Sequence, residues 1–398
     1  MRQTLAWCLM IITAACASDT PSASFAVSDS AGVEVVATSV PSWGRDGSPW
    51  RLSLDVEIGE VEGAEPYLFG DPAGAVWLPD GGVAVADAQS KDIRFFDPDG
   101  KFLRRAGRKG QGPGEFESFS WIRRCGDSLL AYDWVQRRAT PISLSGDVGF
   151  PFRVTTPETG RPPYRLRCLP DGSFLAVGWG DAPPVPPGEE YLYFSQEAEL
   201  WRLFPPADSS ITIGEYISSE RLAHVNRQSG GGGSGPHPFS RSVVFDGDED
   251  HIFIGGAERL QVEVRSLNGQ LLKLYRGPDA DLLVSDSLIA EYEHAELTPR
   301  DSAMRRQLAA ADYPMPERYP AYTEILIDPL GYVWVERFAL PWDTERRWGV
   351  FDPSGVFLGH LSMPLDFRAT DVTATHVVGI AHDELGVARV RVYRLDRN

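Results

Sequence analysis

The sequence predicts an all-β fold, a six-bladed β-propeller, from a cassette that recurs along the chain. In each copy a short aliphatic strand is followed, 17 residues after its first apolar residue, by a turn glycine: Val83 and Gly100, Leu129 and Gly146, Ile252 and Gly269. A longer copy runs from Val333 to Gly355. A repeat of fixed period indicates an architecture made of copies of one supersecondary unit.

The spacing between copies gives the number of blades. The second strands begin 46, 45, 78, 81 and 44 residues apart, at Val83, Leu129, Phe174, Ile252, Val333 and Val377. Three of these steps match the length of a four-stranded propeller blade. Each of the two longer steps holds one blade and an insertion. The sequence therefore predicts six blades, with insertions at 205–238 and 277–320.

Glycine turns and alternating strands define the elements within the blades. Asp97-Pro98-Asp99-Gly100 and Asp352-Pro353-Ser354-Gly355 are near-copies, and glycine supplies the positive φ that tight hairpins require. The last blade lacks an outer strand after 387–393, whereas residues 52–58 alternate between apolar and polar. We expect these two segments to pair and to close the ring, because an open ring would leave free strand edges. Residues 33–36 are expected to add a strand there.

The long connections are expected to share one face of the ring. They follow a second or a fourth strand, and they span 107–118, 180–189, 205–238, 277–320 and 337–346. Binding sites usually lie in variable loops on a rigid scaffold, although a surface insertion without function costs little. The 277–320 insertion, between blades 4 and 5, carries a helix signal at 298–311 and a weaker one at 287–295.

Charge and the N-terminal segment indicate the compartment. The net charge of −18 argues against nucleic acid and anionic lipid surfaces as partners. A basic residue and a short apolar run precede Thr13-Ala14-Ala15-Cys16, which resembles a bacterial lipobox with Cys16 as the acylated residue. We expect a lipoprotein signal peptide at 1–15, a flexible tether at 16–32 and the propeller at 33–398. A lipid anchor would place the chain in the cell envelope, at the outer membrane facing the periplasm. A plain signal peptide and a secreted or periplasmic protein remain the alternative.

Three segments carry a resemblance to a known group of proteins. They are 83–116, which contains Gly110-Gln111-Gly112-Pro113-Gly114-Glu115-Phe116, then 325–359 and 383–393. The chain resembles the exported six-bladed propeller lipoproteins of bacteria, which are related to NHL-repeat propellers. The resemblance implies a propeller fold and export from the cytoplasm. It does not indicate an activity, because propellers serve as enzymes, sensors and scaffolds alike.

Two enzyme classes among related propellers were compared with the residues present. Lactonase-type propellers hold a divalent cation on the axis with Glu, Asn and Asp, but Asn226, Asn268 and Asn398 all lie outside the predicted inner strands. Amidating-lyase propellers bind zinc through histidines, and His251 and His376 sit at turns two blades apart. We therefore expect no metal and no cofactor. A metal-dependent propeller enzyme of either kind remains the alternative.

The inner strands hold the candidate site residues. Cys125 and Cys168 end two successive inner strands, which is consistent with a disulfide in an exported chain or with two buried thiols. Arg123, Arg165 and Arg241 fall on three successive inner strands and could bind a carboxylate or phosphate, or could pair with the protein's own acids. The sequence favours a monomeric binding module that is not an enzyme, with an unknown protein or a small anionic ligand as its partner.

Overall fold

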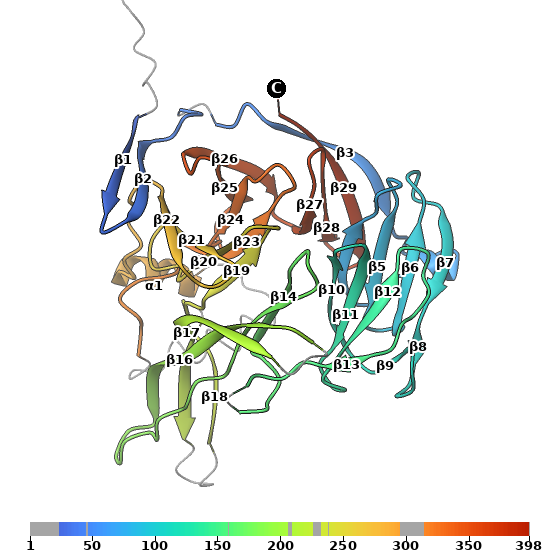
Figure 1. Cartoon of the computed structure of the whole chain (residues 1–398), viewed down its shortest axis with the longest axis horizontal. Helices are drawn as coiled ribbons and strands as arrows, with labels where there is room; N and C mark the ends of the chain where they lie inside the picture. The colour runs from blue at the N-terminus through green and yellow to red at the C-terminus, as the bar shows by residue number, and fades with distance from the viewer. Residues whose placement is uncertain are drawn as a thin grey trace, which may run out of the picture.

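The chain folds into a β-propeller, as predicted. The computed structural model describes residues 24–44, 47–157, 159–205, 209–225, 232–237, 239–294 and 314–397. Within these ranges six sheets have four or more strands, and their first strands surround the middle of the molecule (Figure 1). The repeated cassette of the sequence corresponds to one such sheet.

Each of the first three sheets is an antiparallel meander along the chain. The first three contain β4 (Pro72–Trp77), β5 (Val83–Asp87), β6 (Asp92–Phe96) and β7 (Phe102–Ala106); β10 (Phe119–Cys125), β11 (Ser128–Asp133), β12 (Arg138–Ser143) and β13 (Phe152–Arg153); and β14 (Arg165–Cys168), β15 (Phe174–Val177), β16 (Tyr191–Leu203), β17 (Ser210–Val225) and β18 (Gly232–Pro236). A small parallel pair, β8 (Arg108–Lys109) and β9 (Glu115–Phe116), lies between the first and second sheets in the chain.

The remaining three sheets complete the ring. They contain β19 (Val244–Gly247), β20 (His251–Gly255), β21 (Gln261–Ser266) and β22 (Leu271–Arg276), extended by β1 (Ser24–Ser30) and β2 (Val33–Val40); β23 (Tyr322–Ile327), β24 (Val333–Arg337), β25 (Glu345–Phe351) and β26 (Phe357–Pro364); and β27 (Phe367–Val372), β28 (His376–His382) and β29 (Ala388–Asp396) with β3 (Arg51–Ile58). The 3-10 turn Glu65–Tyr67 and helix α1 (Asp286–His294) are outside the sheets.

The last sheet takes its outer strand from the N-terminal part of the chain. β3 pairs antiparallel with β29, in the register Val390↔Ile58 to Asp396↔Arg51. Arg391 of β29 adds an ion pair to Glu57 of β3, with 2.7 Å between Nε and Oε2. The pairing of these two segments is the one that the alternating pattern predicted.

Apolar side chains fill the space between neighbouring sheets. Six buried clusters each join one sheet to the next, and the cluster containing Val85 and Val390 joins the last sheet to the first. Trp334 and Trp348, both essentially inaccessible, belong to the cluster between the fifth and sixth sheets. Each large apolar side chain that is fully buried stabilises the folded state by about 1.5–3 kcal/mol. These interfaces are therefore the main source of the protein's stability.

The N-terminal strands correct two expectations. Residues 24–30 form strand β1 rather than the end of a tether, because they make a hairpin with β2 through Ala31 and Gly32, whose φ values are 56° and 86°. β2 pairs in parallel with β22 of the fourth sheet, not beside β3. The Lys273 Nζ–Glu34 Oε1 ion pair of 2.8 Å supports this pairing.

The third sheet differs from the predicted insertion at 205–238. Residues 210–225 are strand β17, which pairs with β16 along both strands, so the chain forms a long ribbon instead of a loop. Figure 1 shows this ribbon extending beyond the ring. The period-two pattern at Ile211 and Ile213, of which Ile213 is buried against the third and fourth sheets, explains why this stretch is a strand.

The insertion at 277–320 contains a short helix, α1, where the weaker helix signal lay. The stronger signal at 298–311 and the signal segment at 1–15 lie outside the described residues. Among the helices of the described ranges, none has the length and hydropathy to span a membrane.

Candidate functional site

The predicted axial arginines fall into two groups, those paired with acids and one that is not. On β14, Arg167 donates from Nη2 to Glu324 Oε1 of β23 at 2.5 Å, and Arg165 Nη1 lies 3.5 Å from both oxygens of the same carboxylate. Burial by itself raises the pKa of Glu324, but the charges of Arg167, Arg165 and Arg123 outweigh it and hold that pKa at about 2. Glu324 therefore remains a carboxylate bridge across the axis at ordinary pH.

Arg241 lies before β19 and not on an inner strand as predicted, and its partner is in the long ribbon. Its Nε and Nη2 donate to Glu220 Oε1 at 2.9 and 2.5 Å, and its backbone N–H donates to Oε2 at 2.8 Å. The hydroxyl of Tyr193 donates to the same Oε2 at 2.7 Å. Because Glu220 is 3% exposed, Arg241 neutralises a buried charge, and this pairing occupies the guanidinium.

Arg123 is the remaining member of the predicted set. Within the described ranges its guanidinium has no hydrogen bond and no carboxylate within 4 Å. Burial lowers the pKa of Arg123 to about 10, and Arg167 adds to the effect, while Glu324, Asp246 and Asp371 oppose it. Arg123 thus stays charged and unpaired near the axis.

The two cysteines join neighbouring sheets. Cys125 at the end of β10 and Cys168 at the end of β14 form a disulfide, with 5.7 Å between their Cα atoms. Equivalent positions in adjacent sheets are close because both strands line the axis. The bond links the ends of β10 and β14, just before the tight turn that follows each strand.

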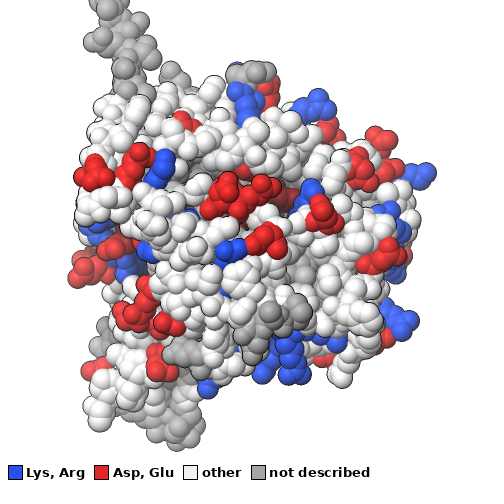
Figure 2. Space-filling model, in the orientation of Figure 1, with Lys and Arg blue, Asp and Glu red and all other residues white. Residues whose placement is uncertain are grey.

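The axial cavity lies at this end of the ring. It has a volume of about 840 Å³, and it is bordered by Arg123, Cys168 and the turns that follow the inner strands, at 126–127, 170, 247–250 and 328–331. We call this side of the ring the turn face. Figure 2 shows acidic side chains grouped near the middle of the ring in the orientation of Figure 1.

The opposite side, the loop face, carries a compact apolar cluster made by the long segments. The ribbon of β16 and β17, the 277–320 insertion and the 337–346 segment each contribute to it, through the buried residues Leu222, Phe239, Leu282, Tyr292, Tyr319 and Leu340. Phe239 stacks edge-on against Tyr292 with 5.3 Å between ring centroids. Three of the five long segments that were predicted to share one face, 205–238, 277–320 and 337–346, thus pack against one another.

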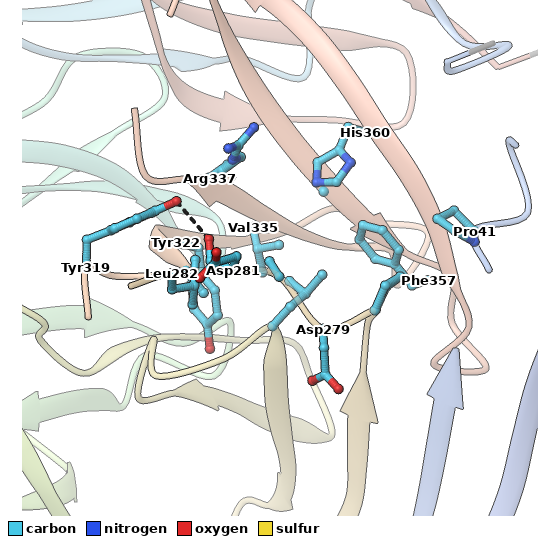
Figure 3. A pocket seen from close by; sticks show the side chains of 15 residues that line it. Pro41, Asp279, Asp281, Leu282, Tyr319, Tyr322, Val335, Arg337, Phe357 and His360 are labelled. Atoms are coloured by element: carbon cyan, nitrogen blue, oxygen red, sulfur yellow. Dashed lines mark hydrogen bonds between the residues drawn. The ribbon is translucent and has the colours of Figure 1, made fainter. Parts of the chain in front are cut away.

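Next to this cluster is the loop-face pocket, between the fourth and fifth sheets (Figure 3). It has a volume of about 330 Å³, and its wall is mainly apolar: Leu260, Leu282, Ala321, Val335, Phe357 and Pro41. Tyr319 fixes the insertion at its edge, because its hydroxyl donates to the Asp281 carbonyl at 3.1 Å. The pocket therefore depends on the 277–320 insertion, which the sequence predicted to be partly helical.

Two basic side chains stand at one end of this pocket. Figure 3 shows Arg337 and His360 on the side away from the Asp279 carboxylate. Arg337, half-buried at the end of β24, has no ion pair or side-chain hydrogen bond to another described residue. Desolvation and, to a smaller extent, the charges of Arg337 and Arg347 together lower the pKa of His360 to about 4. At neutral pH the positive charge at this end is therefore that of Arg337.

The other predicted sites are placed as follows. Cys16 lies outside the described residues. His376 stacks on Trp77 of β4 with ring centroids 4.2 Å apart, and its Nε2 lies 3.4 Å from Asp55 Oδ2, so it links three strands at the ring's seam. In the described part of the chain, no three His, Cys, Asp or Glu side chains are grouped closely enough to hold a metal ion.

Sequence reasoning missed Arg337 and His360. Neither belongs to an inner strand, and the segments that form their pocket are far apart in the chain. The only available signal was that Arg337 begins one of the five long segments.

The known proteins that this chain resembles are distant ones. No protein-family model and no curated protein matches the chain. Among solved structures, a DUF4221-family protein from Bacteroides vulgatus is 11% identical with a TM-score of 0.48, over 88% of this chain and 99% of that protein. A Bacteroides fragilis protein described as exported is 9% identical, with a TM-score of 0.47, over 87% and 95%. A gluconolactonase from Xanthomonas campestris is 12% identical, with a TM-score of 0.43, over 89% and 97%.

Proposed function

We propose that this chain is a binding module of the bacterial cell envelope that holds a small amphipathic carboxylate in the loop-face pocket. The observation that carries the proposal is Arg337, a half-buried guanidinium without an acidic partner among the described residues, at one end of an apolar pocket of about 330 Å³. A carboxylate can accept two parallel hydrogen bonds from such a group.

The other residues that line the pocket would contact the apolar part of the ligand. Leu260, Val335 and Phe357 offer an apolar surface for a short alkyl or aromatic portion. A pocket of this kind, mostly apolar with a few placed polar groups, is typical of small-molecule sites. Asp279 lies at the other end, so the pocket favours one orientation, with the anionic group toward Arg337.

Attachment to the envelope is the second part of the proposal. Cys16, after Thr13-Ala14-Ala15, would be acylated and would hold the propeller at the outer membrane on the periplasmic side. A Cys16→Ala variant expressed with labelled palmitate tests this directly. Incorporation of label that depends on Cys16 supports the anchor, and a secreted, unlabelled wild-type protein contradicts it.

Binding is tested by calorimetry with a graded set of straight-chain carboxylates, hexanoate to dodecanoate, and the matching primary alcohols. We expect saturable binding of the carboxylates and at least tenfold weaker binding of the alcohols. Arg337→Gln should lose at least tenfold in affinity because it removes the charge that the carboxylate pairs with. Ala280→Trp, at an exposed position on the pocket's edge, should block entry.

The control is Arg259→Gln, an exposed arginine nearby that does not line the pocket. It should bind like the wild type. Equal affinity of wild type and Arg337→Gln for every carboxylate would refute the proposal. The metal-dependent enzyme alternative is tested by elemental analysis of the protein after dialysis in metal-free buffer, where one tightly held Ca or Zn per chain would support it.

A further inference from the structure

Charged residues gather at one level of the propeller axis. The second strands can be aligned on their first apolar residues, Val83, Leu129, Phe174, Ile252, Val333 and Val377. The residue after each of these pairs with one inner-strand residue: Val76, Arg123, Arg167, Asp246, Leu326 and Asp371. These positions are equivalent in the six sheets, so they form one ring around the axis. Four of the six are ionisable, which is unusual for strands packed into a core.

Three of the four charged members have partners within the fold. Arg167 is bound to Glu324. Asp246 accepts the N–H of Ile327 at 3.2 Å, and Asp371 accepts the N–H of Trp77 at 2.9 Å, so each aspartate joins its sheet to the next one. Arg123 alone has no such contact among the described residues, although it borders the axial cavity.

The mouth of the axial cavity has the opposite charge. Asp127 and the turn Asp248-Glu249-Asp250 line it on the turn face, and Asp127, Glu249 and Asp250 are exposed. Asp248 accepts the backbone N–H groups of Asp250 and His251 at 2.8 and 2.7 Å, so it fixes the turn that carries the other two acids. Arg124 at the same mouth donates to the Gly126 carbonyl at 3.1 Å.

At its inner end the cavity presents Arg123 beside Asp246 and Asp371, whose carboxylates each accept a backbone N–H, and at its entrance it presents an excess of negative groups. A simple cation would meet Arg123 inside, and a simple anion would have to pass the acidic turn. Charges in a recessed, water-poor cavity interact more strongly than charges on an open surface. A ligand with an anionic end and a cationic end satisfies both regions in one orientation.

We propose that the axial cavity is a second binding site, and that it takes a zwitterionic small molecule of the amino-carboxylate class. The carboxylate pairs with Arg123 at the inner end, and the ammonium group faces Glu249 and Asp250 at the mouth. Its volume of about 840 Å³ falls in the range of small-molecule sites. This site is on the turn face and does not depend on the loop-face pocket.

The test uses calorimetry with three ω-amino carboxylates, γ-aminobutyrate, 5-aminopentanoate and 6-aminohexanoate, and with pentanoate and pentylammonium as probes that carry one charge each. We expect at least one zwitterion to bind, and both single-charge probes to bind at least tenfold more weakly. Arg123→Gln should weaken the zwitterion at least tenfold, whereas Arg153→Gln, an exposed arginine on the outer strand β13, should not.

Two further measurements separate binding from folding. Arg123→Gln removes a charge that favours the ionised forms of Glu324, Asp246 and Asp371, so its thermal midpoint is measured as well. A loss of affinity is evidence for the site only when the variant is folded at the temperature of the calorimetry. Glu249→Gln with Asp250→Asn should weaken the zwitterion and reduce its advantage over pentanoate. Arg337→Gln should leave this binding unchanged. Absence of binding by all three zwitterions at 10 mM (about the weakest useful affinity), or equal binding by Arg123→Gln, overturns the proposal.

Discussion

Arg397 Nη2 lies 2.7 Å from Asp328 Oδ2, across the boundary between the fifth and sixth sheets. The Asp328 carboxylate is fully buried, and it also accepts the indole N–H of Trp334 at 2.9 Å. The Arg397 guanidinium lies against Trp50 and Tyr332, 4.5 and 4.9 Å from their ring centroids. This contact joins the end of β29, the strand that pairs with β3, to the turn after β23 in the preceding sheet.

Removing Arg397 should destabilise the protein. In Arg397→Ala the buried Asp328 carboxylate loses its cation, which we expect to lower the free energy of unfolding by about 3 kcal/mol. Urea unfolding followed by tryptophan fluorescence measures the change. The control is Arg394→Ala, whose side chain is 64% exposed and which should cost less than about 1 kcal/mol. Equal effects of the two substitutions would contradict the importance of the pair.

The disulfide between Cys125 and Cys168 should stabilise the oxidised protein. Its partners are 43 residues apart, and closing a loop of that length in the unfolded chain is worth up to about 4 kcal/mol in the chain-entropy treatment. We expect a reductant to lower the unfolding midpoint of the wild type and to leave the double variant Cys125→Ser, Cys168→Ser unaffected. Identical midpoints for the oxidised and reduced wild type would show that the bond contributes nothing.

Acid should destabilise the protein through His237. Burial lowers the pKa of His237 to about 4 from 6.5, despite the opposing effects of the Pro314 backbone hydrogen bond and of Glu220. Between these two pH values the unfolded chain binds more protons than the folded chain, so stability is complete above pH 6.5 and falls as the pH is lowered toward 4. The loss should approach about 3 kcal/mol.

Thermal midpoints across pH 4–7 measure the His237 effect. The variant His237→Gln should lose part of the slope that the wild type shows below pH 6.5. His382→Gln, at an exposed position of β28, should retain the whole slope. A wild-type midpoint that stays constant over this range would refute the prediction.

Arg241 should matter for stability rather than for ligand affinity. Arg241→Gln leaves Glu220 buried without its cation, which we expect to cost about 3 kcal/mol. The double variant Arg241→Gln, Glu220→Gln should recover part of this loss, because the uncompensated charge is gone. Unfolding free energies of the two variants provide the comparison. A drop in ligand affinity at unchanged stability would instead restore Arg241 to the set of ligand-binding residues.

The repeat made the fold predictable, because local turn chemistry carries it. Gly100 and Gly355 have φ values of 79° and 91°, and Asp97 and Asp352 accept backbone N–H groups within their own turns. The sequence carries one further signal of the repeat. Asp87 and Asp133 end successive second strands 46 residues apart, and each accepts backbone N–H groups of the connection before its sheet. The position of β2 in the fourth sheet could not be predicted from the local sequence, because it depends on a parallel pairing with β22, a distant strand.

The candidate site was predictable only in part. The inner-strand register placed Arg123, Arg165 and Cys125 near the axis, because residues that follow one another at the blade period become neighbours. The partner of Arg165 is Glu324, 159 residues away, and no spacing rule selects it from 56 acidic residues. The partner of Arg241, Glu220, lies in the predicted insertion at 205–238. Arg337 could not be predicted from the sequence, because its pocket is formed by segments that are far apart in the chain.

The pairing of β3 with β29 has a consequence during synthesis. Glu57 and Arg391, which meet across this pair, are 334 residues apart. Translation at about 5–20 residues per second separates their appearance by tens of seconds. For all that time β3 has no partner, so the nascent protein exposes an unpaired strand at both ends of an open arc. A chaperone that shields residues 51–58 until the final strand emerges would therefore protect the chain from joining its neighbours.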